Sequence, residues 1–519
     1  MVAEDTIESE TADSRYGTIL RSTSVIALAS VISVVMSVIR LKVLAVLLGP
    51  VGVGLFGLFN VISDLAASLA GMGVQQSGVR QAAVASSTGD QQRVARIARV
   101  LNLTSWILGS LGAVVLIVLS SPIAKLSFDT EARASGVMLV GLAVLVRIVA
   151  GAPLAMIQGC RRIEDLARMT VIGAVLNTIV AIPLVYLLGE DGVVPSIIAV
   201  ALTSWVTAHW YARKIRLPRI DLSFAEYSAE ARLLLQLGVA FMASGFLTAA
   251  AALLIRILIV QQSGVDAAGN YQAAWALGGI YVGFILQSMG TDFYPRLSAA
   301  ASDNHACNQM VNEQARVSIL LAGPGLLATL ALSPLVIAVF YSTQFVDAVP
   351  LLRWLCVGML LRVVAWPMGF IVLAKGDQKV FFWTEVAAAV VHVGLAWLLL
   401  NVVGLVGAGV AFVGLYAWHG LLIYVIVRRM SGFAWARENL VLIGVFVGLA
   451  GLVLAAVTFM PFWPGHAVAL GVTVVACWYS LAQLVRLVPQ RWIPLRMRPL
   501  VYFLLRHRPA VASGVQNRG

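Results

Sequence analysis

An arginine set in apolar sequence recurs, together with its neighbours, at an offset of 215 or 216 residues along this chain. The stretch VLVRIVAGAP around Arg147 returns as MLLRVVAWP around Arg362, and SVIRLKVL around Arg40 returns as LLIRILIV around Arg256. Two glycine turns keep the same offset: Gly54 with Gly269, and Gly192 with Gly407. One helical unit was therefore duplicated in tandem, and we call the offset of 215 residues, which the glycines and Arg147 share, the repeat step. Ionisable side chains inside a membrane span cost about 2.5 to 3.5 kcal/mol each, so by default they mark a functional site.

The composition is that of an integral membrane protein. Of 519 residues, 60% are hydrophobic and only 12% are charged, and the mean hydropathy is +0.92. Since a span needs about 20 apolar residues, the sequence predicts an all-α fold with about fourteen transmembrane helices. These spans are expected near 19–47, 48–72, 98–121, 135–157, 168–189, 193–212, 233–261, 268–292, 316–340, 348–374, 380–402, 406–427, 439–460 and 465–487.

The repeat predicts how these helices are grouped. Both copies start from the same side of the membrane, so two six-helix lobes are expected to be related in parallel, around a central cavity between them. The expected parts are a cytoplasmic N-terminal segment (1–18), an N-terminal lobe (19–216), a C-terminal lobe (217–430), two extra helices (431–487) and a basic cytoplasmic tail (488–519).

The net charge of +12 is concentrated on one face of the predicted topology. Lys and Arg residues outside the spans fall almost entirely in alternate loops, so the positive-inside rule places both termini in the cytoplasm. That placement needs an even number of spans, and fourteen satisfies it. The charge therefore indicates contact with membrane lipids, along which the tail is expected to lie, and not a nucleic-acid partner.

No motif of a catalytic or metal site is present. The chain has no phosphate-cradling glycine loop with its lysine, no HExxH and no serine elbow. We therefore expect no enzymatic activity, no metal and no cofactor. A proton or sodium gradient, or the membrane potential, is the expected energy source.

The duplicated arginines are the predicted substrate-binding residues. Arg147 and Arg362 lie near the middle of their spans, whereas Arg40 and Arg256 lie nearer the outer face. A guanidinium stays charged and donates paired hydrogen bonds to phosphate, so a cleft that contains all four would bind an anionic headgroup. In the competing interpretation, Arg40 and Lys42 extend to the outer headgroups, and the duplication preserved the arginines for packing.

Acidic residues within spans are few and include the candidates for ion coupling. Asp64 either pairs with one of the cavity arginines, binds a coupling proton or makes a structural ion pair. Glu385 is a second candidate. Asp292 is expected to pair locally with Arg296.

Prolines follow the paired mid-span arginines in both copies. Pro153 comes shortly after Arg147, and Pro367 comes shortly after Arg362. A proline removes one backbone hydrogen bond and bends a helix. We therefore expect similar bends in both lobes, which either serve rocking between two states or are static.

Two early segments carry a family resemblance. LLGPVGVGLFGLFNVISDLAASLAGMGV (47–74), followed by RQAAVASSTGDQQRVARIARVLN (80–102), resembles the polysaccharide-transporter or Wzx-type flippases. Their superfamily also contains multidrug-and-toxin extruders and the peptidoglycan-precursor flippase. The topology resembles this family over nearly the whole chain.

The resemblance implies export of an undecaprenyl-diphosphate-linked oligosaccharide across a bacterial cytoplasmic (inner) membrane, for assembly of a surface glycan such as an O-antigen or exopolysaccharide. Polysaccharide polymerase machinery is the implied protein partner. Three alternatives remain at this point: an ion-coupled multidrug extruder, a peptidoglycan-precursor lipid flippase, and a membrane scaffold for glycan synthesis. An extruder of this superfamily is expected to carry an acid on its first helix, where this chain has Arg40 and Lys42.

Overall fold

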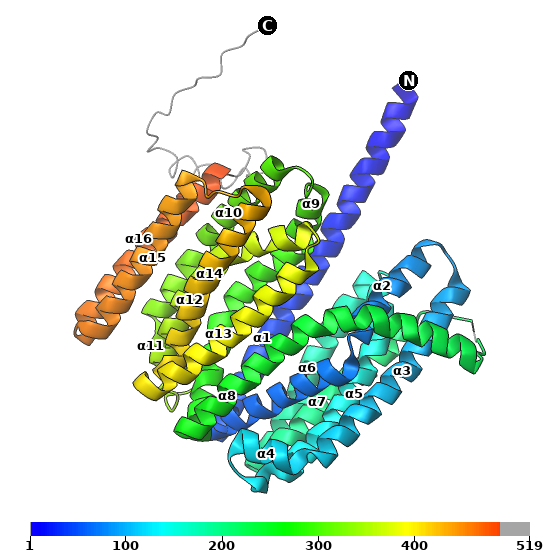
Figure 1. Cartoon of the computed structure of the whole chain (residues 1–519), viewed down its shortest axis with the longest axis horizontal. Coiled ribbons are helices and arrows are strands. Elements are labelled where there is room, and N and C mark those ends of the chain that lie inside the picture. The colour runs from blue at the N-terminus through cyan, green and yellow to red at the C-terminus, as the bar shows by residue number, and fades with distance from the viewer. Residues whose placement is uncertain (1, 219, 488–519) are drawn as a thin grey trace. The chain divides into compact units, whose positions relative to one another are not determined.

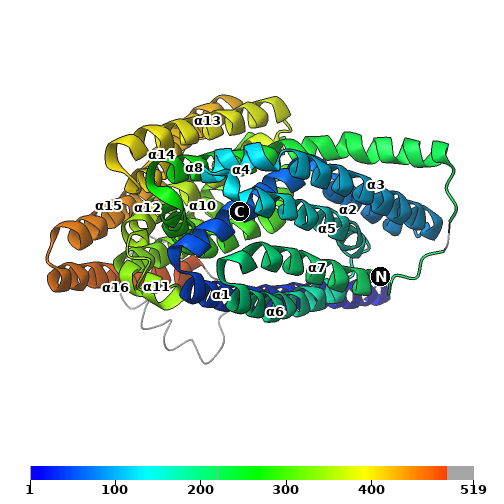
Figure 2. The same ribbon diagram turned by 90° about the horizontal axis from the view of Figure 1, so that it is seen from below.

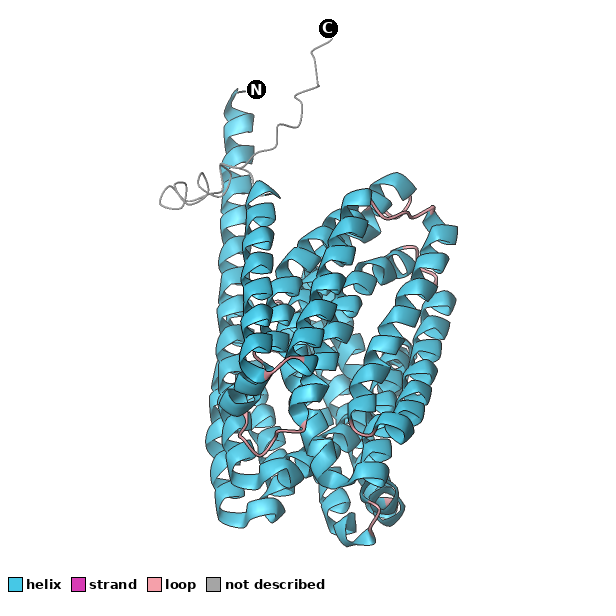
Figure 3. Ribbon diagram, turned by 90° about the vertical axis from the view of Figure 1, so that its left-hand side faces the viewer, coloured by secondary structure: helices cyan, strands magenta, loops and turns pink. Residues whose placement is uncertain are grey.

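The computed structural model describes residues 2–218 and 220–487, with side chains from residue 28 onward except at positions 240, 241, 244, 288 and 291. All regular secondary structure in this part of the chain is helical (Figure 3). The predicted all-α fold is therefore confirmed. The basic tail expected at 488–519 lies outside the described residues.

Helices follow one another with short connections. In chain order the α-helices are α1 (Val2–Gly71), α2 (Val74–Ser87), α3 (Gln91–Val118), α4 (Ser120–Phe128), α5 (Ala134–Gly159), α6 (Ile163–Leu188), α7 (Val193–Ala212), α8 (Phe224–Ser288), α9 (Tyr294–Ala299), α10 (Asn304–Ala331), α11 (Ser333–Phe340), α12 (Ala348–Ala374), α13 (Gln378–Val403), α14 (Val406–Ser431), α15 (Arg437–Phe459) and α16 (Phe462–Leu487). Helices are the expected form because backbone groups inside a bilayer must be satisfied within their own segment.

Eleven stretches of the described residues are long and apolar enough to cross a membrane. Three of them are of double length: 28–71, 163–212 and 245–287 have 44, 50 and 43 residues. Each of the three contains a break in the helix, so they provide six crossings and the remaining eight provide one each. The protein is a multi-pass membrane protein, and its spans agree with the predicted fourteen. One predicted span, 316–340, is instead divided between α10 and α11.

The breaks within α1 and α8 occupy matched positions of the repeat. Gly49 has φ 63° and ψ −167°, and Gly264, its counterpart one repeat step later, has φ 86° and ψ 174°. A positive φ strains any residue with a Cβ, so glycine is required at such a point. Bends were expected at Pro153 and Pro367; α5 and α12 contain these prolines without a break, and the bends stay a prediction. The duplicated feature is the glycine break.

Backbone segments that follow these two breaks contact each other. A Cβ placed on Gly54 would collide with the carbonyl oxygen of Val265, and one placed on Gly269 would collide with that of Pro50. Gly54 and Gly269 are matched positions of the repeat, and so are Pro50 and Val265, so the two contacts are equivalent. The contact is therefore isologous, as at a two-fold axis, and it supports a parallel relation between these segments of α1 and α8.

The chain folds as two compact units. Unit 1 comprises residues 1–274, 334–351 and 382–411, and unit 2 comprises residues 275–333, 352–381 and 412–519. Nothing in this division tests the lobe boundaries expected at 216 and 430, which stay a prediction.

In unit 1, α5 is the central helix of the first repeat. It packs against α2, α3 and α7, and α6 packs against α1 and α7 (Figures 1 and 2). Close packing depends on small residues: a Cβ on Gly109 of α3 would lie 2.9 Å from Leu145. Apolar side chains of α2, α3 and α5 form a buried core that includes Ala82, Ile97 and Ala155. The basic segment 80–102, which resembled the flippases in sequence, thus comprises the end of α2, a turn and the start of α3, and both helices contribute to this core.

In unit 2, the two C-terminal helices α15 and α16 pack against each other and against α10 (Figure 1). The ring of Phe446 fills the space beside Gly323, where an added Cβ would overlap it. The Arg316 guanidinium donates to Glu438 at 2.5 Å. The extra helices are therefore an integral part of this unit.

Candidate functional site

Unit 1 contains a cavity of about 450 Å³ between α1, α5, α6 and α7. We name it the polar pocket. Its wall carries hydroxyl and amide side chains: Ser33, Ser37, Asn60, Asn177, Ser204 and Thr207. Small residues such as Gly151, Gly173 and Ala201 leave the space open. The volume falls within the range of about 300 to 1,000 Å³ that is usual for ligand pockets.

Arg40 of α1 lines the polar pocket. Its Nε is shielded from solvent and has no hydrogen-bond partner, and no ion pair to Arg40 occurs among the described residues. The neighbouring Lys42 points elsewhere: its Nζ donates to the carbonyl oxygens of Ala338, at 2.8 Å, and of Tyr341. A shielded guanidinium nitrogen without a hydrogen-bond partner is unfavourable. The structure thus places Arg40 at the wall of the polar pocket, and its substrate-binding role stays a prediction.

Arg147 of α5 also lines the polar pocket, where it is the second cation. On its other side it lines a smaller cavity of about 220 Å³, the junction pocket, together with Asp64, Ser68, Gln76 and Ser105. Gln75 lines both pockets. Arg147 therefore stands where the two cavities adjoin.

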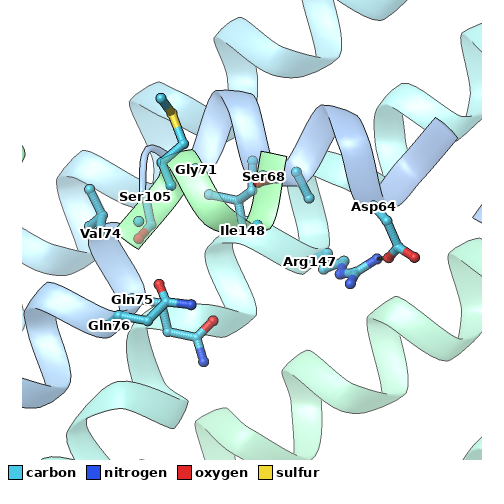
Figure 4. Close-up of a pocket in the computed structure, with 13 residues that line it drawn as sticks. Asp64, Ser68, Gly71, Val74, Gln75, Gln76, Ser105, Arg147 and Ile148 are labelled. Carbon is cyan, nitrogen blue, oxygen red and sulfur yellow. Dashed lines mark hydrogen bonds and ion pairs between the residues drawn. The ribbon is translucent and has the colours of Figure 1, made fainter. Parts of the chain in front are cut away.

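The Arg147 Nη1 donates to Asp64 Oδ1 of α1, and Figure 4 shows the two side chains pointing toward each other. The pair stays accessible, because 51% of the Arg147 side chain and 46% of the Asp64 side chain are exposed. This contact confirms that Asp64 pairs with one of the predicted site arginines.

Arg256 of α8 lies in a different environment. Only 4% of the residue is exposed. Its Nη1 donates to the Ala252 carbonyl oxygen at 2.9 Å, its Nη2 donates to Gln272 Oε1 at 2.7 Å, and the guanidinium lies 5.4 Å from the centre of the Tyr271 ring. Protein groups already occupy most of its donors, and it lines neither pocket. A substrate-binding role for Arg256 stays a prediction.

Arg362 of α12 belongs to unit 2. Its guanidinium lies 4.7 Å from the centre of the Trp366 ring and 5.8 Å from that of Tyr416. Aromatic faces attract cations. The rings of Trp366 and Tyr416 therefore stabilise the charge of Arg362, as the Asp64 carboxylate stabilises the charge of Arg147. Of the four predicted arginines, the structure thus brings Arg40 and Arg147 into one pocket, whereas Arg256 and Arg362 have other surroundings.

Two acids expected within spans lie away from these pockets. Glu385 of α13 lines neither of them, and its coupling role stays a prediction. Asp292 accepts from the Arg296 Nη2 at 3.0 Å, so the predicted local ion pair is confirmed.

Sequence reasoning missed the polar wall. Its side chains are spaced three or four residues apart along their helices, as in Ser33 and Ser37, or Ser204 and Thr207. This spacing puts them on one face of a helix. Asn177 is fixed within the wall, because it accepts from the Thr203 hydroxyl and its Nδ2 lies 3.5 Å from Ser204 Oγ. Polar residues at helical spacing in apolar spans were the available signal.

A comparison with known families and curated proteins places the chain among proteins of glycan assembly. A family model described as "Polysaccharide biosynthesis protein" matches residues 43–350. A lipid III flippase of Escherichia coli (strain K12) is 25% identical over 387 residues, which cover 72% of this chain and 90% of that protein. The lipid III flippase of Shigella flexneri matches with the same identity and coverage.

Solved structures share the fold. An inward-facing multidrug resistance MATE family transporter of the MOP superfamily gives a TM-score of 0.67 at 17% identity, over 77% of this chain and 94% of that one. The lipid II flippase MurJ, in an inward closed conformation, gives 0.64 at 11% identity, over 89% of this chain and 98% of that one. At these identities the likeness establishes the fold alone.

Proposed function

Because the chain belongs to the polysaccharide biosynthesis protein family, we propose that it is a flippase for an undecaprenyl-diphosphate-linked oligosaccharide. It moves this substrate from the inner to the outer leaflet of the bacterial cytoplasmic membrane by alternating access. The oligosaccharide is then available to a polymerase for assembly of a surface or exopolysaccharide. In this orientation both termini are cytoplasmic.

The observation that carries the proposal is the unpaired Arg40 in the polar pocket. Arg40 and Arg147 are the charged residues of its lining, which contains no acid. Each phosphodiester carries about one negative charge, so a diphosphate matches the two cations. Fork-shaped guanidinium groups suit phosphate oxygens. The pocket thus favours a diphosphate as the held group.

The remainder of the pocket wall suits a sugar. Hydroxyl and amide groups such as Asn60, Asn177 and Ser204 can both donate and accept hydrogen bonds, as sugar hydroxyls require. The proximal sugar is expected here, next to the diphosphate, while the prenyl chain stays in lipid.

Two alternatives share the fold. A multidrug extruder of cationic amphiphiles would use an acid as the attracting group, and in unit 1 the Asp64 carboxylate is already paired with Arg147. A lipid II flippase would also bind a prenyl diphosphate, and it differs from the proposal only in the sugars attached.

Energy coupling is proposed to use the membrane potential or an ion gradient, with Asp64 and Glu385 as candidate carriers of the coupling ion. Asp64 is the stronger candidate of the two because it adjoins the pocket cation Arg147.

Deletion of the gene tests the proposal. Surface polysaccharide should fall and undecaprenyl-diphosphate-linked intermediates should accumulate, and their mass would identify the substrate. Plasmid-borne wild-type protein should restore export, whereas Arg40→Ala should not, although its membrane abundance stays normal. Arg168→Ala is the matched control, since Arg168 pairs with Glu164 on an exposed helix face. Normal glycan with raised sensitivity to cationic drugs would favour the extruder, and accumulated peptidoglycan precursor would favour the lipid II alternative.

A further inference from the structure

The Asp64 carboxylate stands at the side of the polar pocket where a bound anion would meet Arg147. Arg147 lines both cavities, but Asp64 lines only the junction pocket and Arg40 lines only the polar pocket. A phosphate that entered the polar pocket would therefore approach the Arg147 guanidinium from one side. Asp64 pairs with the same guanidinium from the other side, at the junction pocket.

The contact between Asp64 and Arg147 is of a kind that a substrate can replace. One nitrogen, Nη1, donates to one carboxylate oxygen, Oδ1, and about half of each side chain is exposed. Exposed ion pairs of this kind are weak, because water screens them and their side chains lose freedom. A phosphate can accept several of the five guanidinium N–H groups at once.

A carboxylate beside the pocket also opposes the substrate. Two like charges at close range repel each other, so Asp64 and the phosphate compete for one cation. Arg40 has no such competitor among the described residues.

We infer that Asp64 is an internal competitor for Arg147: it occupies the guanidinium in the empty protein and is displaced by the phosphate of the substrate. This inference rests on the proposed function and assigns a positioning role within the same site. Asp64 lowers the affinity for the anion. A carrier gains from this, because a substrate bound too tightly on one side of the membrane would not be released on the other.

The test is calorimetric binding of inorganic pyrophosphate to the full-length protein in lipid nanodiscs. Asp64→Asn should bind pyrophosphate about tenfold more tightly than the wild type, since the competing charge is removed. Asp64→Glu keeps the charge and should bind as the wild type does. Asp292→Asn is the matched control, because it breaks an arginine–carboxylate pair in unit 2 that lines neither pocket.

A double-mutant cycle separates competition from a general change of structure. If Asp64 acts through Arg147, the gain from Asp64→Asn disappears in an Arg147→Ala background, so the two effects are not additive. Unchanged or weaker binding by Asp64→Asn overturns the inference, and so does a tenfold gain that persists without Arg147. The proposed function fails separately, if Arg40→Ala and Arg147→Ala bind pyrophosphate as well as the wild type.

Discussion

The matched arginines Arg147 and Arg362 lie in different environments in the two copies of the repeat. In the first copy, Arg147 faces an open polar pocket and pairs with Asp64. In the second copy, Arg362 is covered by aromatic rings. The pocket positions and their counterparts one repeat step later are Asn60 and Trp275, Gly151 and Trp366, Ile197 and Phe412, Ala201 and Tyr416, and Ser204 and His419.

The counterpart residues form an aromatic cluster within unit 2, which we define as Trp275, Arg362, Trp366, Phe412, Tyr416 and His419. Its rings touch in sequence: the ring centres of Trp275 and Phe412 are 5.2 Å apart, and those of Phe412 and Tyr416 are 4.9 Å apart. Asp64 has Gly279 as its counterpart, so the acid is replaced as well. The comparison teaches that duplication conserved the cation, but that polar and small residues line a ligand-sized pocket beside it in the first copy where the matched positions of the second copy carry aromatic rings.

The largest effect is expected when the first copy is made to resemble the second. Gly151→Trp introduces the indole that the second copy carries as Trp366, into a pocket where even a Cβ would lie 3.1 Å from Gln75 Oε1. We expect loss of glycan export in the deletion strain, because the pocket is filled. Gly448→Trp is the control, since a Cβ at Gly448 of α15 meets nothing within 4 Å. Normal export by Gly151→Trp would show that the polar pocket does not hold the substrate.

Removal of the two equivalent arginines should separate transport from stability. Arg147→Ala removes the charge-assisted hydrogen bonds that the guanidinium is proposed to donate to the substrate phosphate. Such a bond is worth about 1.5 to 3 kcal/mol, so transport by the reconstituted protein should fall about 10- to 100-fold. Arg362→Ala deletes cation–π contacts worth about 0.5 to 2 kcal/mol, so it should lower thermal stability while transport stays near the wild type. Flipping of a fluorescent prenyl-diphosphate glycan in proteoliposomes and a melting curve measure both. Equal loss of transport in the two variants would break the comparison.

Much of this could be predicted from one sequence. Hydropathy indicated the helices, and the nearly equal offsets between matched arginines revealed the repeat. A pair between Asp64 and a site arginine was one of the alternatives left open for that acid. Gly49 and Gly264 are also separated by one repeat step, but the sequence analysis did not identify them as helix breaks.

The sequence did not predict which residues surround each arginine side chain. Arg40 and Arg256 share a sequence context but their neighbours differ, since Gln272 and Tyr271 enclose Arg256. Which neighbours enclose a helical residue depends on packing between helices, which no single stretch encodes. The four arginines were therefore predicted to form one site; the structure places Arg40 and Arg147 on the polar pocket of unit 1, and the shared site of all four stays a prediction.

Replacement of Arg256 tests, with a smaller expected effect, whether this arginine stabilises the fold or binds substrate. Arg256→Ala leaves Gln272 and the Ala252 carbonyl without the donor that the structure provides. Loss of such buried bonds costs about 1 to 3 kcal/mol, so the protein should melt earlier and be less abundant in the membrane. Pyrophosphate binding per folded molecule should be nearly unchanged. A normal melting curve together with lost binding would instead place Arg256 with Arg40 and Arg147 as a substrate residue.

The smallest effect on export is expected at Glu226, which lies outside the polar pocket and the aromatic cluster. It serves as a control for whether the losses of export in the other variants are specific to those sites. Glu226, at the start of α8, accepts from the Ser223 backbone N–H at 3.0 Å and from its hydroxyl at 2.8 Å, and Arg96 of α3 lies 3.7 Å away. The hydrogen bonds from Ser223, followed by the charge of Arg96, hold the pKa of Glu226 below its ordinary value of 4.5.

A lowered pKa fixes the direction of the pH effect. The ionised form is favoured in the folded protein, so its contribution is complete above pH 4.5 and is lost as the pH falls through the lowered pKa. Protection of the amides over residues 224–231, taken relative to their intrinsic exchange rates at each pH, should therefore fall below pH 4.5 in the wild type, and Glu226→Gln should show the lower protection above pH 4.5 as well. Export should not change in this variant, because the contact is exposed and lies outside the polar pocket and the aromatic cluster. A transport defect as large as that of Arg147→Ala would mean that loss of any charge contact impairs the protein, and the contrast between the two copies would then lose its meaning.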